Sequence, residues 1–117
     1  MNIYRHLSEL RKAIPDCHLA AFIDLNANMV MAHEARSKPP QERLDGLADQ
    51  AERLLKAPGM DGPIDHVLIV SGENLEVFGK GAADGVAMVC GLDTSVEKAV
   101  QHGKTWLEQL QHEGIAV

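Results

Sequence analysis

The stretch that most constrains the fold is residues 65–92, in which three short apolar runs alternate with glycine-containing breaks. The apolar runs are residues 67–70, 75–78 and 86–90, and the breaks between them are residues 72–74 and 79–85. Short runs rich in β-branched residues and bounded by Gly and Asn are typical of strands joined by hairpins. The stretch therefore predicts a three-stranded antiparallel meander, which the rest of the chain must cover.

The segment before the meander predicts a helix followed by two strands. In residues 2–14 the apolar residues recur at helical period, with Asn2 as a candidate N-cap and Pro15 ending the helix. Residues 18–25 are apolar on both alternating faces, which predicts a central strand covered above and below. A turn at residues 26–28, rich in Asn, leads to a second strand at residues 29–33, and residues 34–40 form a loop.

Two more helices flank the meander. Residues 41–56 carry an apolar stripe with Gly46 outside it, and a connection at residues 57–64 rich in Pro and Gly follows. Thr94 and Glu97 form a candidate capping box for a last helix that runs to about residue 112, before Gly114. The order α-β-β-α-β-β-β-α predicts a single α+β domain over residues 1–117, with a five-stranded antiparallel sheet.

The charge balance excludes several classes of partner. The chain has a formal net charge of −6, whereas nucleic acid requires a clustered basic patch. No apolar run is long enough to span a membrane, and the N-terminal residues lack the apolar core of a signal peptide. We therefore expect a cytoplasmic protein. In that compartment Cys17 and Cys90 are expected to be reduced, buried core residues.

No arrangement of residues predicts catalysis, a cofactor or a metal site. His33 and Glu34 begin like a zinc-protease motif, but Ser37 stands where the second histidine is required. The glycines of residues 79–85 lie between antiparallel strands, so they are expected to form a hairpin and not a phosphate-binding loop. Convergence of His18 with His66 is the one metal-site alternative, and solvated histidines are the favoured interpretation.

The order and lengths of these elements resemble the roadblock/dynein light chain family, of the profilin-like and longin-related group. The resemblance rests on IPDCHLAAFID, MVMAHEA, LDGLADQAERLL, HVLIVSGENLEVF and GVAMVCGLD taken together. It covers nearly the whole chain and implies a sheet order of 2-1-5-4-3, with helices on both faces. The first turn, LNANM, departs from the Asp-Gly that many members carry, and Asn can take its place.

The resemblance also implies a homodimer, because family members pair along the third strand and pack their second helices together. Here that strand would be an edge with four consecutive apolar residues and no interior Lys or Pro to protect it. The predicted strand contacts are Val67, Leu68, Ile69 and Val70, and the predicted helix contacts are Leu44, Leu47, Ala48, Ala51 and Leu55. The alternative is a monomer whose second helix covers only its own sheet.

Two functions follow as hypotheses. The first is a non-enzymatic interaction module that regulates or scaffolds a partner, because the paired second helices of the family form a platform for small Ras-like GTPases. The polar residues of that helix that would contact a partner are Asp45, Asp49, Glu52 and Arg53. The alternative is a small-molecule sensor, with Met29, Met31 and Met88 lining a pocket between sheet and helices.

Overall fold

A computed structural model describes residues 2–56 and 65–113 of the chain. The elements in chain order are α1 (Ile3–Ala13), β1 (Cys17–Asp24), β2 (Met29–Ala35), α2 (Gln41–Lys56), β3 (His66–Val70), β4 (Asn74–Lys80), β5 (Asp84–Gly91) and α3 (Val96–Glu113). The predicted order α-β-β-α-β-β-β-α is confirmed. The predicted connection at residues 57–64 and the helix end at Gly114 lie outside the described residues.

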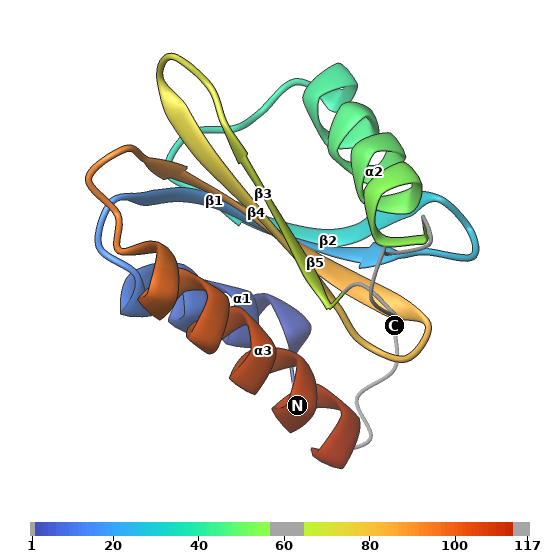
Figure 1. The fold of residues 1–117 in the computed structure, drawn as a ribbon. Coiled ribbons are helices and arrows are strands. Elements are labelled where there is room, and N and C mark those ends of the chain that lie inside the picture. The colour runs from blue at the N-terminus through green and yellow to red at the C-terminus, as the bar shows by residue number, and fades with distance from the viewer. Residues whose placement is uncertain (1, 57–64, 114–117) are drawn as a thin grey trace.

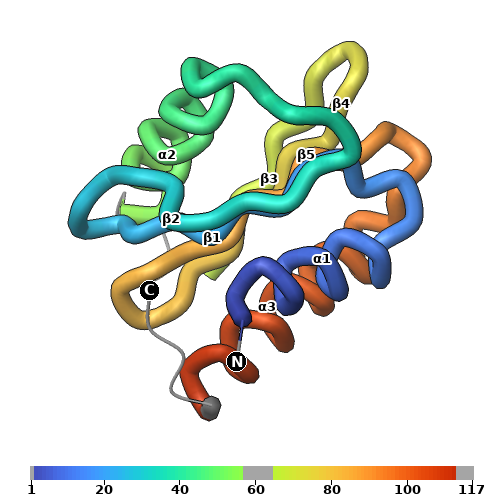
Figure 2. The backbone as a smooth tube through the Cα atoms, turned by 180° about the vertical axis from the view of Figure 1, so that it is seen from behind, coloured from blue at the N-terminus to red at the C-terminus, as the bar shows by residue number. Residues whose placement is uncertain are grey.

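All five strands form one antiparallel sheet in the order β2-β1-β5-β4-β3. Helices α1 and α3 lie side by side on one face, and α2 crosses the other (Figures 1 and 2). The central strands β1 and β5 are buried along almost their whole length, as expected for strands that are apolar on both faces. This leaves β2 and β3 as the two edges of the sheet.

The sheet divides the core into two layers. The layer beneath α1 and α3 contains Leu7, Leu10, Phe22, Val77, Met88, Trp106 and Leu110, among others. The layer beneath α2 contains Leu19, Ile23, Leu47, Leu55, Phe78 and Val89, among others. Because side chains alternate along a strand, neighbouring residues of β4 enter opposite layers, with Val77 under α3 and Phe78 under α2.

Trp106 belongs to the core. Its side chain is 5% exposed, and its indole Nε1–H donates a 2.9 Å hydrogen bond to the carbonyl oxygen of His6 in α1. Its ring meets Phe22 of β1 edge to face, with the ring centroids 5.8 Å apart. One side chain therefore ties α3 to both α1 and the sheet.

The first turn folds as its asparagines predict. Asn28 has a φ of 55°, in the left-handed region that Asn tolerates better than most residues. The Asp24 carboxylate accepts hydrogen bonds from the backbone N–H groups of Asn26 and Ala27, each 2.9 Å long. At the start of α1, Asn2 caps the helix by accepting from the N–H of Tyr4, as predicted.

Three local predictions are wrong. Strand β2 continues to Ala35, because Glu34 and Ala35 pair with β1 where a loop was expected. Strand β4 extends to Lys80 and strand β5 begins at Asp84, so the hairpin loop is only residues 81–83. The cap of α3 is Ser95 and not Thr94, since the Ser95 hydroxyl accepts from the N–H of Lys98.

Candidate dimer and partner surface

Strand β3 has one hydrogen-bonded neighbour, β4, in the part of the chain that the structure describes. Its register with β4 is continuous, with Leu68 opposite Val77 and no bulge along its length. The second long side of the strand is a sheet edge. Such an edge presents a row of unpaired backbone N–H and C=O groups, which can pair with another strand.

The register shows which backbone groups face outward. At the two ends of the ladder, Lys80 N–H donates to Asp65 O at 2.8 Å and Ser71 N–H donates to Asn74 O at 2.9 Å. In an antiparallel pair, hydrogen-bonded and non-hydrogen-bonded positions alternate. Residues 65, 67, 69 and 71 therefore bond to β4. The N–H and C=O groups of His66, Leu68 and Val70 point away from the sheet.

The same residues also carry the exposed side chains of this strand. Leu68 is 38% exposed and Val70 is 70% exposed, on the face that α1 and α3 cover elsewhere. Val67 and Ile69 are half-buried on the other face, against the layer beneath α2. The edge thus combines free backbone groups with exposed apolar side chains, as the sequence predicted for this strand.

The predicted contact residues of α2 face the protein's own sheet. Five side chains are between 0% and 5% exposed: Leu44, Leu47, Ala48, Ala51 and Leu55. Periodicity shows that one helix face is buried, but not what buries it. A dimer contact of these residues therefore stays a prediction.

Two hydrogen bonds define the flanks of α2. The Arg43 guanidinium donates to the buried Glu76 carboxylate of β4 at 2.9 Å, on the side of the helix nearer β3. Asn28, in the turn before β2, donates to Asp49 at 2.9 Å on the opposite side. At 100° per residue, Gln50 and Leu54 share the flank of Arg43, and Gly46 lies on the outer side of the helix, midway between Arg43 and Asp49. The sequence analysis did not single out this flank as a contact.

Gly46 lies on the outer side of α2 and has open surroundings. A Cβ atom added there would meet nothing within 4 Å. The glycine therefore makes no close approach within its own chain, although it weakens the helix by about 1 kcal/mol relative to Ala. A helix glycine that its own chain does not require is a signal for close packing by another molecule.

The four predicted partner residues lie on the outer and β2-facing sides of α2. Asp45, Asp49 and Arg53 are exposed, and Glu52 is half-buried. Asp45 accepts a hydrogen bond from Gln41 at 2.9 Å, and Glu52 pairs with Lys56 at 3.7 Å. Asp45, Asp49 and Glu52 form an acidic surface on the β2-facing side of the helix, and Arg53 lies beside Gly46 on its outer side.

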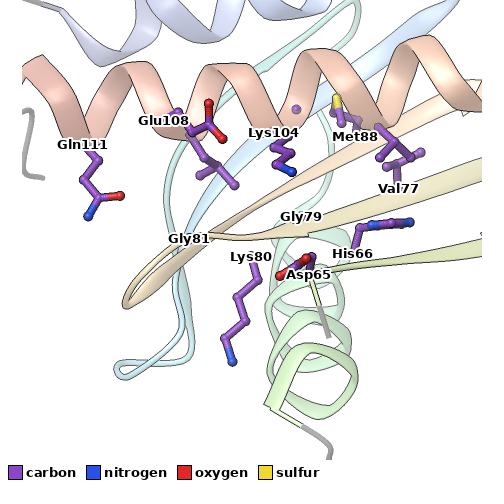
Figure 3. Close-up of a pocket in the computed structure, with 13 residues that line it drawn as sticks. Asp65, His66, Val77, Gly79, Lys80, Gly81, Met88, Lys104, Glu108 and Gln111 are labelled. Carbon is purple, nitrogen blue, oxygen red and sulfur yellow. The ribbon is translucent and has the colours of Figure 1, made fainter. Parts of the chain in front are cut away.

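A cavity of about 290 Å³ opens between α3 and the β3–β4 end of the sheet (Figure 3). Its apolar lining comes from Val77, Met88, Val100 and Leu107, and polar side chains surround it. Figure 3 shows Lys104 pointing from α3 toward the sheet, whereas Lys80 extends away on the other side. Gly79 and Gly103 also line the cavity, and a Cβ atom at Gly103 would lie 2.7 Å from Met88 Cε.

The three methionines predicted to line a pocket do not converge. Met88 lines the cavity beside α3, but Met29 is 50% exposed at the start of β2 and Met31 packs against the layer beneath α1 and α3. His18 and His66 are also apart, because β5 and β4 lie between their strands. Among residues 2–56 and 65–113, no group of three metal-ligating side chains is present.

Comparison with known proteins places this geometry in a family of folds. No family model matches the chain, and no curated protein matches its sequence. A roadblock/LC7 domain from Streptomyces avermitilis superposes with a TM-score of 0.83 at 13% identity, over 99% of this chain and 100% of that one. The chain has the roadblock/LC7 fold.

Two further structures place this roadblock/LC7 fold among related ones. An MglB protein in a tetrameric arrangement matches with a TM-score of 0.76 at 19% identity, covering 95% of this chain and 88% of that one. Profilin IA from Acanthamoeba castellanii matches with a TM-score of 0.61 at 14% identity, over 97% of this chain and 100% of that one. The predicted roadblock-like and profilin-like architecture, with sheet order 2-1-5-4-3, is confirmed.

Proposed function

We propose that the protein is a non-enzymatic, homodimeric roadblock module that regulates a small Ras-like GTPase. The observation that carries the dimer is the edge of β3, where the backbone groups of His66, Leu68 and Val70 face outward beside exposed apolar side chains. An open, flat edge of this kind favours pairing with another strand. A second copy of the same strand satisfies it symmetrically.

The outward-facing groups favour one register for this pairing. An antiparallel ladder with Leu68 opposite Leu68 of the second copy also sets His66 opposite Val70. This register uses all the outward N–H and C=O groups of β3, whereas a shift by one residue in either direction leaves some of them unpaired. It also brings the exposed side chain of Leu68 against its copy, and that of Val70 against His66 of the second copy, which removes apolar surface from water.

The same pairing brings the two copies of α2 together along one flank. Arg43, Gln50 and Leu54 lie on the side of α2 nearer β3, and Gly46 leaves open space on the adjoining outer side. Small residues allow helix backbones to approach closely. In this arrangement the opposite sides of both helices, with Asp45, Asp49 and Glu52, remain free to contact a partner, and Arg53 lies between the two surfaces.

Regulation of a GTPase is the role that the roadblock resemblance implies and that the MglB likeness supports. The surface of α2 has charged side chains that can bind a partner, but no residues arranged to make or break covalent bonds. The module would therefore act by binding the GTPase and repositioning the GTPase's own catalytic groups. We place it in the cytoplasm, where such GTPases act. Within the described residues, no helix is long and apolar enough to cross a membrane.

Amide hydrogen exchange tests the dimer edge. At concentrations that favour association, we expect the amides of His66, Leu68 and Val70 to be protected, and their protection to fall on dilution. The amides of Val67 and Ile69 are the internal control, because β4 protects them in either state. Outward amides that exchange equally fast at all concentrations would contradict the proposed pairing.

Titration with the small Ras-like GTPases of the host, loaded with GDP or a GTP analogue, tests the partner. We expect one of them to bind, and the double variant Asp49→Lys/Arg53→Glu to weaken that binding about tenfold (~1.4 kcal/mol). Glu97→Lys, on the exposed start of α3 across the sheet, is the control and should have no effect. Binding that is insensitive to both variants would remove α2 from the partner surface.

The small-molecule sensor remains a second candidate because of the cavity beside α3. Its volume of about 290 Å³ and its apolar lining with few polar groups suit a small amphipathic ligand. A ligand at a hundredfold its Kd should add about 2.7 kcal/mol of stability, which a thermal-shift screen detects. Gly79→Val, which would fill the cavity, should abolish that shift. A screen without any shift would count against the sensor.

A further inference from the structure

Cys17 and Cys90 are neighbours across two adjacent strands. Cys17 begins β1 and is paired with Cys90 near the end of β5. Both side chains enter the same core layer beneath α1 and α3, both are 0% exposed, and both are free thiols. These are the two cysteines of the chain. The sequence suggested only inert core residues, because the separation between them along the chain says nothing about strand register.

The backbone around the pair has the geometry that a disulfide requires. Gly91 N–H donates to Asp16 O at 3.0 Å, so residues 16 and 91 form a hydrogen-bonded position of the ladder. The next position, Cys17 opposite Cys90, is therefore a non-hydrogen-bonded pair, beside a register shift between Cys17 and Leu19. In a regular ladder the Cα atoms of such a pair lie about 4.5 Å apart and the side chains are closest. A disulfide spans Cα separations of about 4.4–6.8 Å, so the bond needs no large movement of the backbone.

The thiols themselves interact. A side-chain hydrogen bond with Cys90 lowers the pKa of Cys17, and Arg11 and Arg36 lower it further, although burial acts in the opposite direction. The same hydrogen bond, together with burial, raises the pKa of Cys90. Cys17 is thus the better nucleophile of the two, with Cys90 held beside it.

We propose that Cys17 and Cys90 form a reversible redox modification site, which a small disulfide-containing molecule converts into a cross-strand disulfide. The Cys17 thiolate attacks one sulfur of the small disulfide, and the other sulfur leaves with the electron pair and takes a proton. Cys90 then loses its proton and attacks the Cys17 sulfur, which releases the second small thiol. Two protein thiols are oxidised, and one small disulfide is reduced to two thiols.

Two features of the pair favour the second step over a stable mixed disulfide. Once Cys17 is bonded to the small molecule, it no longer carries the charge that raises the pKa of Cys90, so Cys90 ionises more easily. Cys90 also lies directly opposite the sulfur that it must attack. Because both thiols are buried, the first step requires local opening of the turn between α1 and β1, so oxidation should be slow.

Incubation of the purified protein with oxidised glutathione tests the proposal. After quenching with a thiol alkylating agent in denaturant, we expect an unalkylated chain that is lighter by two hydrogen atoms. Digestion should give one linked peptide pair that contains Cys17 and Cys90. The disulfide closes a long loop, so the Tm should rise by roughly 10 °C and return to its original value on reduction with dithiothreitol.

The variants Cys17→Ser and Cys90→Ser separate this reaction from simple modification of a thiol. Each should at most gain one glutathione, with no rise in Tm. The proposal is overturned if both wild-type cysteines remain alkylatable after prolonged incubation, if glutathione adducts persist, if the bond forms between chains, or if oxidation lowers the Tm. If the serine variants fail to fold, the wild-type mass, linked peptides and melting temperature still decide the question.

Discussion

The two edges of the sheet differ in how they are protected. Strand β2 has a register irregularity opposite Phe22 and Ile23, carries His33 and Glu34, and packs against both α1 and α2. Strand β3 is less protected: its register is continuous, its apolar residues are consecutive, and Leu68 and Val70 are exposed, although α2 packs against its other face. Bulges, charges and covering helices are the usual ways in which proteins prevent an edge from pairing.

This contrast within one sheet supports the proposal that the edge of β3 pairs with a second copy. A register irregularity interrupts β2, and the register of β3 has none. Substitutions can remove the difference between the two edges or measure how much single residues contribute to association and stability.

The largest expected effect comes from giving β3 the protection that it lacks. Leu68→Lys sets two lysines opposite each other in the proposed pairing, so we expect the Kd of self-association to rise about a hundredfold (~2.7 kcal/mol). The fold should persist, because the side chain is already 38% exposed. Met29→Lys, at a 50% exposed position of β2, is the matched control. Sedimentation equilibrium of both variants checks the difference, and equal weakening by the two would contradict it.

The second effect concerns the ion pair that holds α2 beside β3. Arg43→Met leaves the Glu76 carboxylate, whose residue is 8% exposed, without its partner, which should lower the free energy of unfolding by about 2 kcal/mol. Glu76→Gln should cost less, because the Arg43 side chain is 37% exposed and water can solvate it. Urea unfolding in the Leu68→Lys background measures both without a contribution from association. If Glu76→Gln lowered the free energy of unfolding more than Arg43→Met does, this interpretation would be wrong.

The third effect distinguishes the flanks of α2. Gly46→Gln should weaken self-association about tenfold (~1.4 kcal/mol), because it fills the space between the proposed helices. It should not destabilise the monomer, since nothing lies within 4 Å of the new Cβ and the helix gains propensity. Asp45→Gln introduces the same side chain on the other flank and should leave the Kd unchanged. Analytical gel filtration over a dilution series compares them; loss of affinity in Asp45→Gln alone would favour the opposite flank.

The smallest expected effect is on the pH dependence of stability and concerns Asp84. This residue is opposite Asp24 at the ends of β5 and β1, away from both edges. Burial, and to a lesser extent the charge of Asp24, raises the pKa of Asp84, although a hydrogen bond with its own backbone acts against this. The folded state therefore holds this proton more tightly than the unfolded chain. Its contribution to stability is complete below the ordinary Asp pKa of about 4 and is lost as the pH rises through the folded pKa.

Asp84→Asn should consequently stabilise the protein by about 0.5 kcal/mol at pH 7. The gain over the wild type should disappear as the pH falls below about 4. Urea unfolding at several pH values measures it, with exposed Asp93→Asn as the control. Self-association should not change, because neither carboxylate lies at a sheet edge. A gain that grows toward low pH would contradict the assigned direction of the pKa shift.

The sequence predicted the order of the elements because apolar periodicity and turn residues act locally. It predicted strand β1 as central and β3 as an exposed run, and both placements are confirmed. The stripe of α2 that includes Leu47 faces the protein's own sheet, and its part in a dimer contact stays a prediction. The register of Cys17 with Cys90 could not be predicted, because it depends on strands that are distant in sequence.

Sedimentation equilibrium of the unmodified protein at micromolar concentration tests the central claim most directly. If the edge of β3 pairs with a second copy, the protein should sediment as a species of twice 12.7 kDa that dissociates on dilution. A single species near 12.7 kDa at all concentrations, with the amides of His66, Leu68 and Val70 unprotected, would contradict the account.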